Sequence, residues 1–159
     1  MRKLWNRPDY PVWSLVTQGR DGGFNMNICS YVTAVSMQPK VMLIAVYLGT
    51  QSRDNLVKNG QVRLQLLTEV DAPLVRLLGQ QSGKKVAKVA RLEKRGLISY
   101  QAGWPYLKNA AGYLDLTVTE IITTGLDHDL VLGTVTTHQN LTDANVLTTT
   151  YLKANKFTR

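Results

Sequence analysis

Few residues in this chain have the types and spacing that catalysis by side chains alone would need. The sequence has two histidines, His128 and His138, and a single cysteine, Cys29. The motifs GxSxG, HExxH, CxxC, GxxxxGK(S/T) and GxGxxG do not occur in it. One cysteine can form neither an intramolecular disulfide nor a multi-cysteine zinc site, and we expect no metal centre. If the protein is an enzyme, a bound cofactor should therefore carry the chemistry.

The polar loop that follows the apolar run 41–48 has the composition of a phosphate site. Thr50 and Ser52 stand where a helix over 52–59 should begin, with Gly60 just past its end. The free N–H groups and the positive dipole end of a helix start favour a bound phosphate, and both hydroxyls can donate hydrogen bonds. The same residues also serve as ordinary helix caps. The pattern alone leaves both interpretations open.

His128 is the second candidate for a functional role. Asp127 and Asp129 flank it, but alternation along a strand would place both carboxylates on the face opposite the imidazole. We therefore expect no array of nucleophile, base and acid around it. Leu130 and Leu132 share the face of His128, which should turn the imidazole inward.

The net charge is +8, from 19 basic and 11 acidic residues, and seven of the basic residues lie within 76–95. A basic surface suits an anionic partner, such as nucleic acid, acidic lipid or a phosphate-bearing small molecule. No aromatic residue is interleaved with these cations, which does not favour nucleic acid. No apolar run approaches the roughly 20 residues of a membrane span. No apolar signal region follows the basic N-terminus, so a cytoplasmic location is expected.

The elements that must position these residues are mostly strands. A chain of 159 residues suits one domain, spanning 1–159 with a core at about 11–152. Hydrophobic periodicity predicts strands over 12–17, 25–36, 41–48, 62–68, 114–119, 128–136 and 146–151, and helices over 52–59, 71–79 and 82–95. Strands do not alternate with helices one for one. The pattern therefore favours a closed or nearly closed antiparallel barrel with inserted helices over a doubly wound parallel sheet.

Six segments occur in an order that is more specific than any one of them. They are Pro11-Val12 with Val16-Thr17, Asn25 with Tyr31, Val35-Ser36 with Pro39 and the helix start at Ser52, Ser82-Gly83-Lys84 with Lys88, Gly103 to Ala110 (GWPYLKNA), and Asp127-His128 with Gly133-Thr134-Val135. In this order, over about residues 11–136, the chain resembles the flavin reductase-like, FMN-binding split-barrel family, and particularly its flavoredoxin-like branch. Departures include Tyr31 where the branch often has Trp, and Leu126 where it has Gly.

The resemblance implies a split antiparallel β-barrel of Greek-key type and a homodimer with FMN near the dimer interface. It also implies the binding residues, which are Asn25, Tyr31, Thr33, Ala34, Val35, Thr50, Ser52, Lys88 and His128. Ser52 and Lys88 would meet the phosphate, and Tyr31 would lie against the ring. Asn25 and the backbone N–H groups of 33–35 would meet the pyrimidine edge. His128 would lie where a nicotinamide must stack, which makes it the expected catalytic residue.

Three functions remain open on this basis. The leading hypothesis is an FMN-dependent oxidoreductase that takes a hydride from NADH or NADPH and passes it to free flavin or another acceptor. The second keeps FMN without the nicotinamide, as an electron carrier of the flavoredoxin kind. The third is a binding module without enzyme activity that uses its basic surface. Partners expected under the first are a second copy of the chain, flavin and nicotinamide, with neither nucleic acid nor a membrane.

Overall fold

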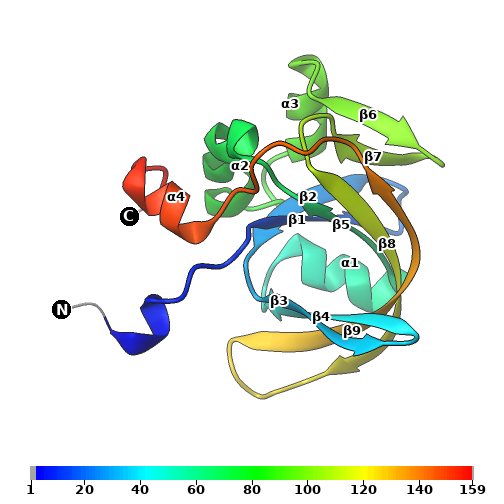
Figure 1. Ribbon diagram of the computed structural model, residues 1–159. Coiled ribbons are helices and arrows are strands. Elements are labelled where there is room, and N and C mark those ends of the chain that lie inside the picture. Colours follow the sequence, from blue (N-terminus) through cyan, green and yellow to red (C-terminus); the bar gives the residue numbers. More distant parts are fainter. Residues whose placement is uncertain (1–2, 159) are drawn as a thin grey trace.

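Residues 3–158 of the chain are described by a computed structural model built around a seven-stranded sheet (Figure 1). The strand order is β2-β1-β5-β8-β9-β4-β3, and every neighbouring pair is antiparallel. The strands are β1 (Trp13–Gln18), β2 (Phe24–Cys29), β3 (Val32–Met37), β4 (Lys40–Tyr47), β5 (Gln61–Leu66), β8 (Gly112–Ile122) and β9 (His128–Asn140). The protein is mainly β, as the sequence predicts.

The two edge strands, β2 and β3, follow one another along the chain with only Ser30 and Tyr31 between them. Edges that meet at so short a link require the sheet to curl round on itself, which leaves a barrel open along one seam. The helix α1 (Gln51–Asn59) contacts β1, β2 and β4 and lies across that opening (Figure 1). The predicted fold class, a split antiparallel barrel with inserted helices, is therefore confirmed.

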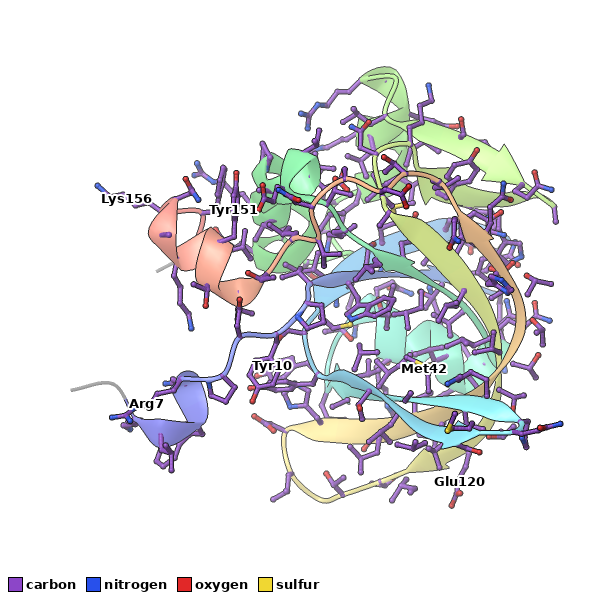
Figure 2. The ribbon with its side chains drawn as sticks, in the orientation of Figure 1. Arg7, Tyr10, Met42, Glu120, Tyr151 and Lys156 are labelled. Atoms are coloured by element: carbon purple, nitrogen blue, oxygen red, sulfur yellow. The ribbon has the colours of Figure 1, made fainter. Side chains whose placement is uncertain are left out.

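Two apolar cores lie on opposite faces of the sheet. Leu15 and Met42 belong to the core inside the barrel, where Figure 2 labels Met42, whereas Val16 and Met26 belong to a core outside it. Successive side chains of a strand point to opposite faces, so neighbouring residues of β1 serve different cores. This explains why most of the predicted strand 12–17 is buried rather than alternately buried and exposed.

Short helical segments cover the outer core. They are the 3-10 helix η2 (Glu69–Leu74), α2 (Val75–Gln80), α3 (Lys88–Lys94) and α4 (Thr149–Ala154), while a further 3-10 helix, η1 (Leu4–Asn6), lies in the N-terminal segment. The helix predicted over 71–79 is thus present as η2 followed directly by α2. Among residues 3–158, no helix has the length and apolar character needed to cross a membrane.

The helix predicted over 82–95 is shorter in the structure, because α3 begins only at Lys88. The preceding residues form turns in which the Ser82 side chain accepts a hydrogen bond from the Lys84 N–H at 3.3 Å and the Ser82 carbonyl accepts one from Val86 at 3.0 Å. Serine side chains that bond nearby backbone groups compete with helix formation, and glycine at 83 weakens it further.

The strand predicted over 146–151 is wrong. Only isolated bridges, Pro11 to Thr148 and Thr68 to Val146, remain there, and α4 begins at Thr149. The Thr148 side chain caps this helix by accepting a hydrogen bond from the Tyr151 N–H at 3.2 Å. A side-chain cap of this kind outweighed the β-branched composition of the segment.

The predicted strand 25–36 is two strands, β2 and β3, and a short hairpin was not anticipated at all. This hairpin, β6 (Ile98–Gln101) with β7 (Trp104–Leu107), is held to the barrel by Arg63. The buried guanidinium pairs with Asp115 at 2.7 Å and donates to the Trp104 carbonyl at 2.7 Å. Strand β9 also runs on to Asn140, beyond the predicted end at residue 136, so His138 lies in a strand.

Candidate functional site

Two adjoining cavities lie along the seam of the barrel. The first, which we call the His128 cavity, has a volume of about 320 Å³ and includes Cys29, Tyr31 and His128 in its wall. The second, the α1 cavity, has a volume of about 380 Å³ and lies between the start of α1 and the residues that follow α2. Both cavities are lined by Asn27, Ile28 and Tyr47, so they form one continuous groove. Two adjoining spaces with different linings suit a ligand with two chemically different ends.

The α1 cavity has a helix start in its wall. Thr50 is the N-cap of α1, where its hydroxyl accepts from the Arg53 N–H at 3.2 Å and donates to the Tyr47 carbonyl at 2.9 Å. The N–H groups that precede Arg53 in the first turn have no acceptor within the helix, and Gln51 lines the cavity. The helix therefore presents free donors and its positive dipole end to this space.

A buried cation lies in the same wall. Lys88, the first residue of α3, is only 3% exposed, and its ammonium donates to the Leu78 carbonyl at 2.6 Å. No carboxylate of residues 3–158 forms a salt bridge with it. Burial lowers the pKa of Lys88 to about 8. A buried cation without an anionic partner beside an open cavity is well placed to meet an anionic ligand.

Asn25 and Ser52 form a buried polar pair beneath this cavity. The Asn25 side-chain amide donates to the Ser52 hydroxyl at 3.0 Å, and Asn25 lines the cavity whereas Ser52 does not. The Oδ1 atom of Asn25 is buried and has no partner. Gly83 makes this arrangement possible, since a Cβ atom there would collide with the Asn25 side chain. Gly79 plays the same part beside Ile28, whose Cδ1 would lie 2.7 Å from an added Cβ.

His128 is held by one carboxylate and two aromatic rings. Its Nδ1 lies 2.8 Å from the Asp127 Oδ1, and its ring centroid lies 5.6 Å from that of Tyr31 and 5.2 Å from that of Tyr47. The hydrogen bond from His128 lowers the pKa of Asp127. This contact differs from the expectation that alternation would separate the two. Asp127 precedes β9, so its side chain is not bound by the alternation of the strand.

Asp129 does obey that alternation and serves a different purpose. Its buried carboxylate pairs with Arg53 of α1, with an Oδ2 to Nη2 distance of 2.9 Å and an Nε distance of 3.0 Å. The pair joins the first turn of α1 to the beginning of β9, where His128 is the first residue. The helix start and the imidazole therefore belong to one rigid arrangement, although they lie in different cavities.

The three residues expected at a ring edge, Thr33, Ala34 and Val35, lie on the exposed edge strand β3 and line neither cavity. One side of β3 pairs with β4, with an irregularity between Ala34 and Ser36. Its other side has no strand partner within residues 3–158. The structure thus groups Asn25, Thr50 and Lys88 at one end of the groove and Tyr31 with His128 at the other, apart from the 33–35 segment.

Several lining residues were not anticipated from the sequence. Asn27 and Tyr47 line both cavities, Gln51 lines the α1 cavity, and Gly79 and Gly83 let the chain approach Asn25 and Ile28. One signal was available for Tyr47, because it ends a buried strand just before a helix cap. No signal was available for Asn27, because the sequence does not show which face of the edge strand β2 borders the groove.

A third cavity, of about 420 Å³, lies at one end of the barrel and is separate in its lining from the groove. Trp13, Leu66, Leu114 and Val146 form its apolar wall, and His138 stands at its rim. Within residues 3–158 no three His, Cys, Asp or Glu side chains are grouped so that they could hold a metal ion.

Solved structures with the same fold share little sequence with this chain. An FMN-binding protein from Thermus thermophilus with bound 1-cyclohex-2-enone has a TM-score of 0.75 and 20% identity, over 88% of this chain and 75% of its own. Flavoredoxin from Methanosarcina acetivorans has a TM-score of 0.74 and 19% identity, over 88% and 75%. The styrene monooxygenase flavin reductase from Pseudomonas putida S12 has a TM-score of 0.73 and 16% identity, over 89% and 86%.

The search of curated proteins gives no match. A family model does match the sequence: the flavin reductase like domain covers residues 6–156 of this chain. That range contains both cavities, the seam between them and all six segments on which the sequence resemblance rests. On the strength of this match, the chain belongs to the flavin reductase-like family.

Proposed function

We propose that this protein is an FMN-dependent oxidoreductase that takes a hydride from NADH or NADPH and passes electrons to free flavin or to another acceptor. The observation that carries the proposal is the groove, which has a helix start and a buried cation at one end and two tyrosines with an imidazole at the other. A flat, mostly apolar ring system joined to a phosphate by a flexible chain has matching ends.

The residues present fit FMN on features of the structure itself. Lys88 is a buried cation without an anionic partner, and the first turn of α1 has free N–H donors, so a phosphate would supply the charge that both lack. The close approach of Gly83 leaves the Oδ1 of Asn25 buried and unpartnered, which an N–H or O–H of the ligand would satisfy. Tyr31 and His128 offer ring faces at the other end. Bound FMN would supply the redox chemistry, since its ring accepts a hydride and later releases two electrons.

The chain's own residues then have distinct duties. Lys88 and the α1 start hold the phosphate, while the pair between Arg53 and Asp129 fixes the helix relative to β9. Asp127 orients the His128 ring through Nδ1, so that the Nε2 side remains available toward the cavity. Hydride transfer between two flat rings needs alignment and exclusion of water more than it needs a protein acid or base. This agrees with the lining of the His128 cavity, which includes one imidazole and, among the described residues, no carboxylate.

An anaerobic titration separates the candidate functions. Protein loaded with FMN should lose its flavin absorption when NADH or NADPH is added, and should recover it when an acceptor is admitted. Loaded protein that neither nucleotide bleaches, but that a chemical reductant does, would be an electron carrier of the flavoredoxin kind. Protein that takes up no FMN and binds DNA with a steep salt dependence would be a binding module instead.

The proposal includes a homodimer. Met37 is 86% exposed at the end of the edge strand β3, and Val35, Ile122 and Leu126 are further exposed apolar side chains. An unpaired edge strand with exposed apolar residues is suited to cover by a second copy. Sedimentation should therefore find a dimer at micromolar concentration, and Met37→Lys should weaken it. A wild-type monomer under those conditions would contradict this part of the proposal.

We also propose a cytoplasmic location. Cys29 is the single cysteine, so no intramolecular disulfide ties the fold to an oxidising compartment. Fractionation of cells that express the chain with a C-terminal tag tests the location directly.

A further inference from the structure

The residues that follow α2 carry more positive charge than one phosphate needs. Six exposed basic side chains lie between residues 76 and 95, besides the buried Lys88; they are Arg76, Lys84, Lys85, Arg91, Lys94 and Arg95. Among the described residues, only Lys84 of these six forms a salt bridge, with Asp54 of α1 at 2.9 Å. The one acid in the segment, Glu93, accepts a hydrogen bond from Tyr100 at 2.7 Å.

Part of this charge lies at the rim of the groove. The wall of the α1 cavity includes Gln81, Ser82 and Gly83, and the next two residues along the chain are Lys84 and Lys85. Arg91 reaches the same wall from α3, because its guanidinium donates to the Gln81 side chain at 3.4 Å. We call Lys84, Lys85 and Arg91 the rim cations. Lys94 is the last residue of α3 and Arg95 is its C-cap, about one turn beyond Arg91, since each residue advances the helix by about 1.5 Å.

The rim cations have no role in holding FMN as described above. That ligand has one phosphate, and the start of α1 with Lys88 already meets it. The second substrate of the proposed reaction is a dinucleotide, which must place its nicotinamide at the His128 cavity. With FMN in the groove, the adenosine half of such a substrate must lie over the rim of the α1 cavity, where the rim cations stand beside Gln81, Ser82 and Gly83. Of the two nicotinamide dinucleotides, only NADPH carries an additional phosphate on its adenosine ribose.

We infer that the rim cations Lys84, Lys85 and Arg91 bind the 2′-phosphate of NADPH and make it the preferred hydride donor. The inference rests on the proposed function and narrows its substrate. Arginine forms a planar fork for a phosphate, and lysine adds a mobile point charge, so Arg91 with Lys85 makes a complementary pair. NADH lacks the 2′-phosphate and so leaves Lys85 and Arg91, which have no salt bridge within residues 3–158, without an anionic partner.

The test compares Lys85→Gln/Arg91→Gln with the matched control Lys94→Gln/Arg95→Gln. Both variants remove two positive charges from exposed positions of the same segment, but only the first alters the rim. The binding probes are adenosine 2′,5′-bisphosphate and AMP, measured by calorimetry on FMN-loaded protein. Wild type and control should bind the bisphosphate at least about tenfold more tightly than AMP, and the rim variant should lose that preference. In turnover, the rim variant should raise KM for NADPH with kcat and the NADH reaction unchanged.

The outcomes separate this inference from the function beneath it. Equal binding of the two probes by wild type, or equal loss of preference in the control, overturns the role of the rim cations while leaving the oxidoreductase intact. A second outcome is that the preference for the bisphosphate depends on the rim cations but neither NADH nor NADPH reduces the bound flavin. That result would support a nucleotide site at the rim and would refute a nicotinamide as the electron donor. A third outcome is that an acidic protein or DNA binds tightly and competes with the bisphosphate, while turnover shows no preference for NADPH. That result would overturn the inference in favour of a macromolecular partner.

Discussion

The two ends of the groove are built in different ways. At the α1 end the polar groups are buried and their positions are fixed by neighbours, with Lys88 held by the Leu78 carbonyl and Asn25 held by Ser52. At the His128 end the aromatic walls are open, since Tyr31 is 58% and Tyr47 is 56% exposed. The first end has its polar groups buried within one chain, whereas the second has exposed aromatic surfaces that a ligand or a second copy could cover.

This difference suggests that affinity and reactivity are separate properties of the two ends. A preformed buried site concentrates binding energy, because few side chains must be ordered when the ligand arrives. An open aromatic site leaves room for a second flat ring to enter, which a hydride donor requires. Changes at the α1 end should therefore alter flavin affinity, and changes at the His128 end should alter the rate of reduction.

The largest effect should follow from Lys88→Met. Removing the buried ammonium deletes a charged hydrogen bond to the phosphate, worth about 2–3 kcal/mol, so FMN should bind about 100-fold more weakly. The stability of the apo protein should change little, because removal of a buried unpaired charge offsets the loss of its hydrogen bond to the Leu78 carbonyl. Fluorescence titration with FMN and thermal unfolding measure the two quantities. An affinity within twofold of wild type would locate the phosphate elsewhere.

The pH dependence of FMN affinity should come from the same residue. Burial lowers the pKa of Lys88 to about 8 in the free protein, and a bound phosphate would raise it again. Binding must therefore take up a proton above about pH 8, and the affinity should fall by up to about tenfold per pH unit there. Below pH 8 the lysine is already charged and this dependence should vanish.

Unfolding has the opposite dependence on pH. The folded pKa of Lys88 lies below its unfolded value of 10.5, so between about pH 8 and 10.5 the unfolded chain binds more protons. The contribution of Lys88 to the free energy of unfolding of the apo protein should therefore rise with pH across that window. Lys88→Met should remove both dependences. A wild-type affinity that stays flat from pH 7 to pH 9 would show that Lys88 does not meet the phosphate.

At the other end, His128→Ala should slow reduction by NAD(P)H by about tenfold, which corresponds to ~1.4 kcal/mol of barrier. That modest loss suits a group that positions the incoming ring and does not transfer a proton. FMN affinity should change by less than about threefold, because few polar contacts at this end are buried. Stopped-flow reduction of FMN-loaded protein measures the rate.

The control for this variant is His138→Ala. His138 lies at the rim of the separate barrel-end cavity and should not affect reduction. Equal rates for the two variants would remove His128 from the reaction. A His128 variant that fails to fold can be replaced by Asp127→Asn, which leaves the ring in place and should change the pH profile of reduction, because it removes the negative charge from the 2.8 Å contact.

Periodicity predicted most strands correctly because a strand in a two-sided core must satisfy a burial pattern over many residues. The strand pair of β5 and β8 follows that rule along its length. The failures lie where one or two local hydrogen bonds decide the outcome. At 146–151 the Thr148 cap selected a helix, and at 82–87 the Ser82 bonds delayed one. Such hydrogen bonds depend on side-chain geometry, about which hydrophobic periodicity gives no information.

The site was predictable to the level of its segments but not of its side chains. The sequence placed a helix start after 41–48 and a histidine at the start of a strand, and both line the groove. It could not tell which of two hydroxyls, on Thr50 or Ser52, faces the cavity. That choice depends on the helix beginning at Gln51, one residue earlier than predicted, with Thr50 as its cap, which turns Ser52 into the interior.

Ser52→Ala should therefore have only a small effect on flavin affinity, although its hydroxyl was the expected phosphate donor. Ser52 is fully buried, accepts a hydrogen bond from Asn25 and does not line the cavity. Its loss would leave the Asn25 amide without a buried acceptor, lowering the free energy of unfolding by about 1–2 kcal/mol. FMN affinity should fall only a few-fold, through a looser Asn25, whereas Thr50→Ala should destabilise α1 by about 1 kcal/mol through the lost cap. Urea unfolding and FMN titration of both variants test this. A drop in affinity as large as that of Lys88→Met, with stability unchanged, would mean that Ser52 bonds the phosphate directly and that the α1 end rearranges on binding instead of being preformed.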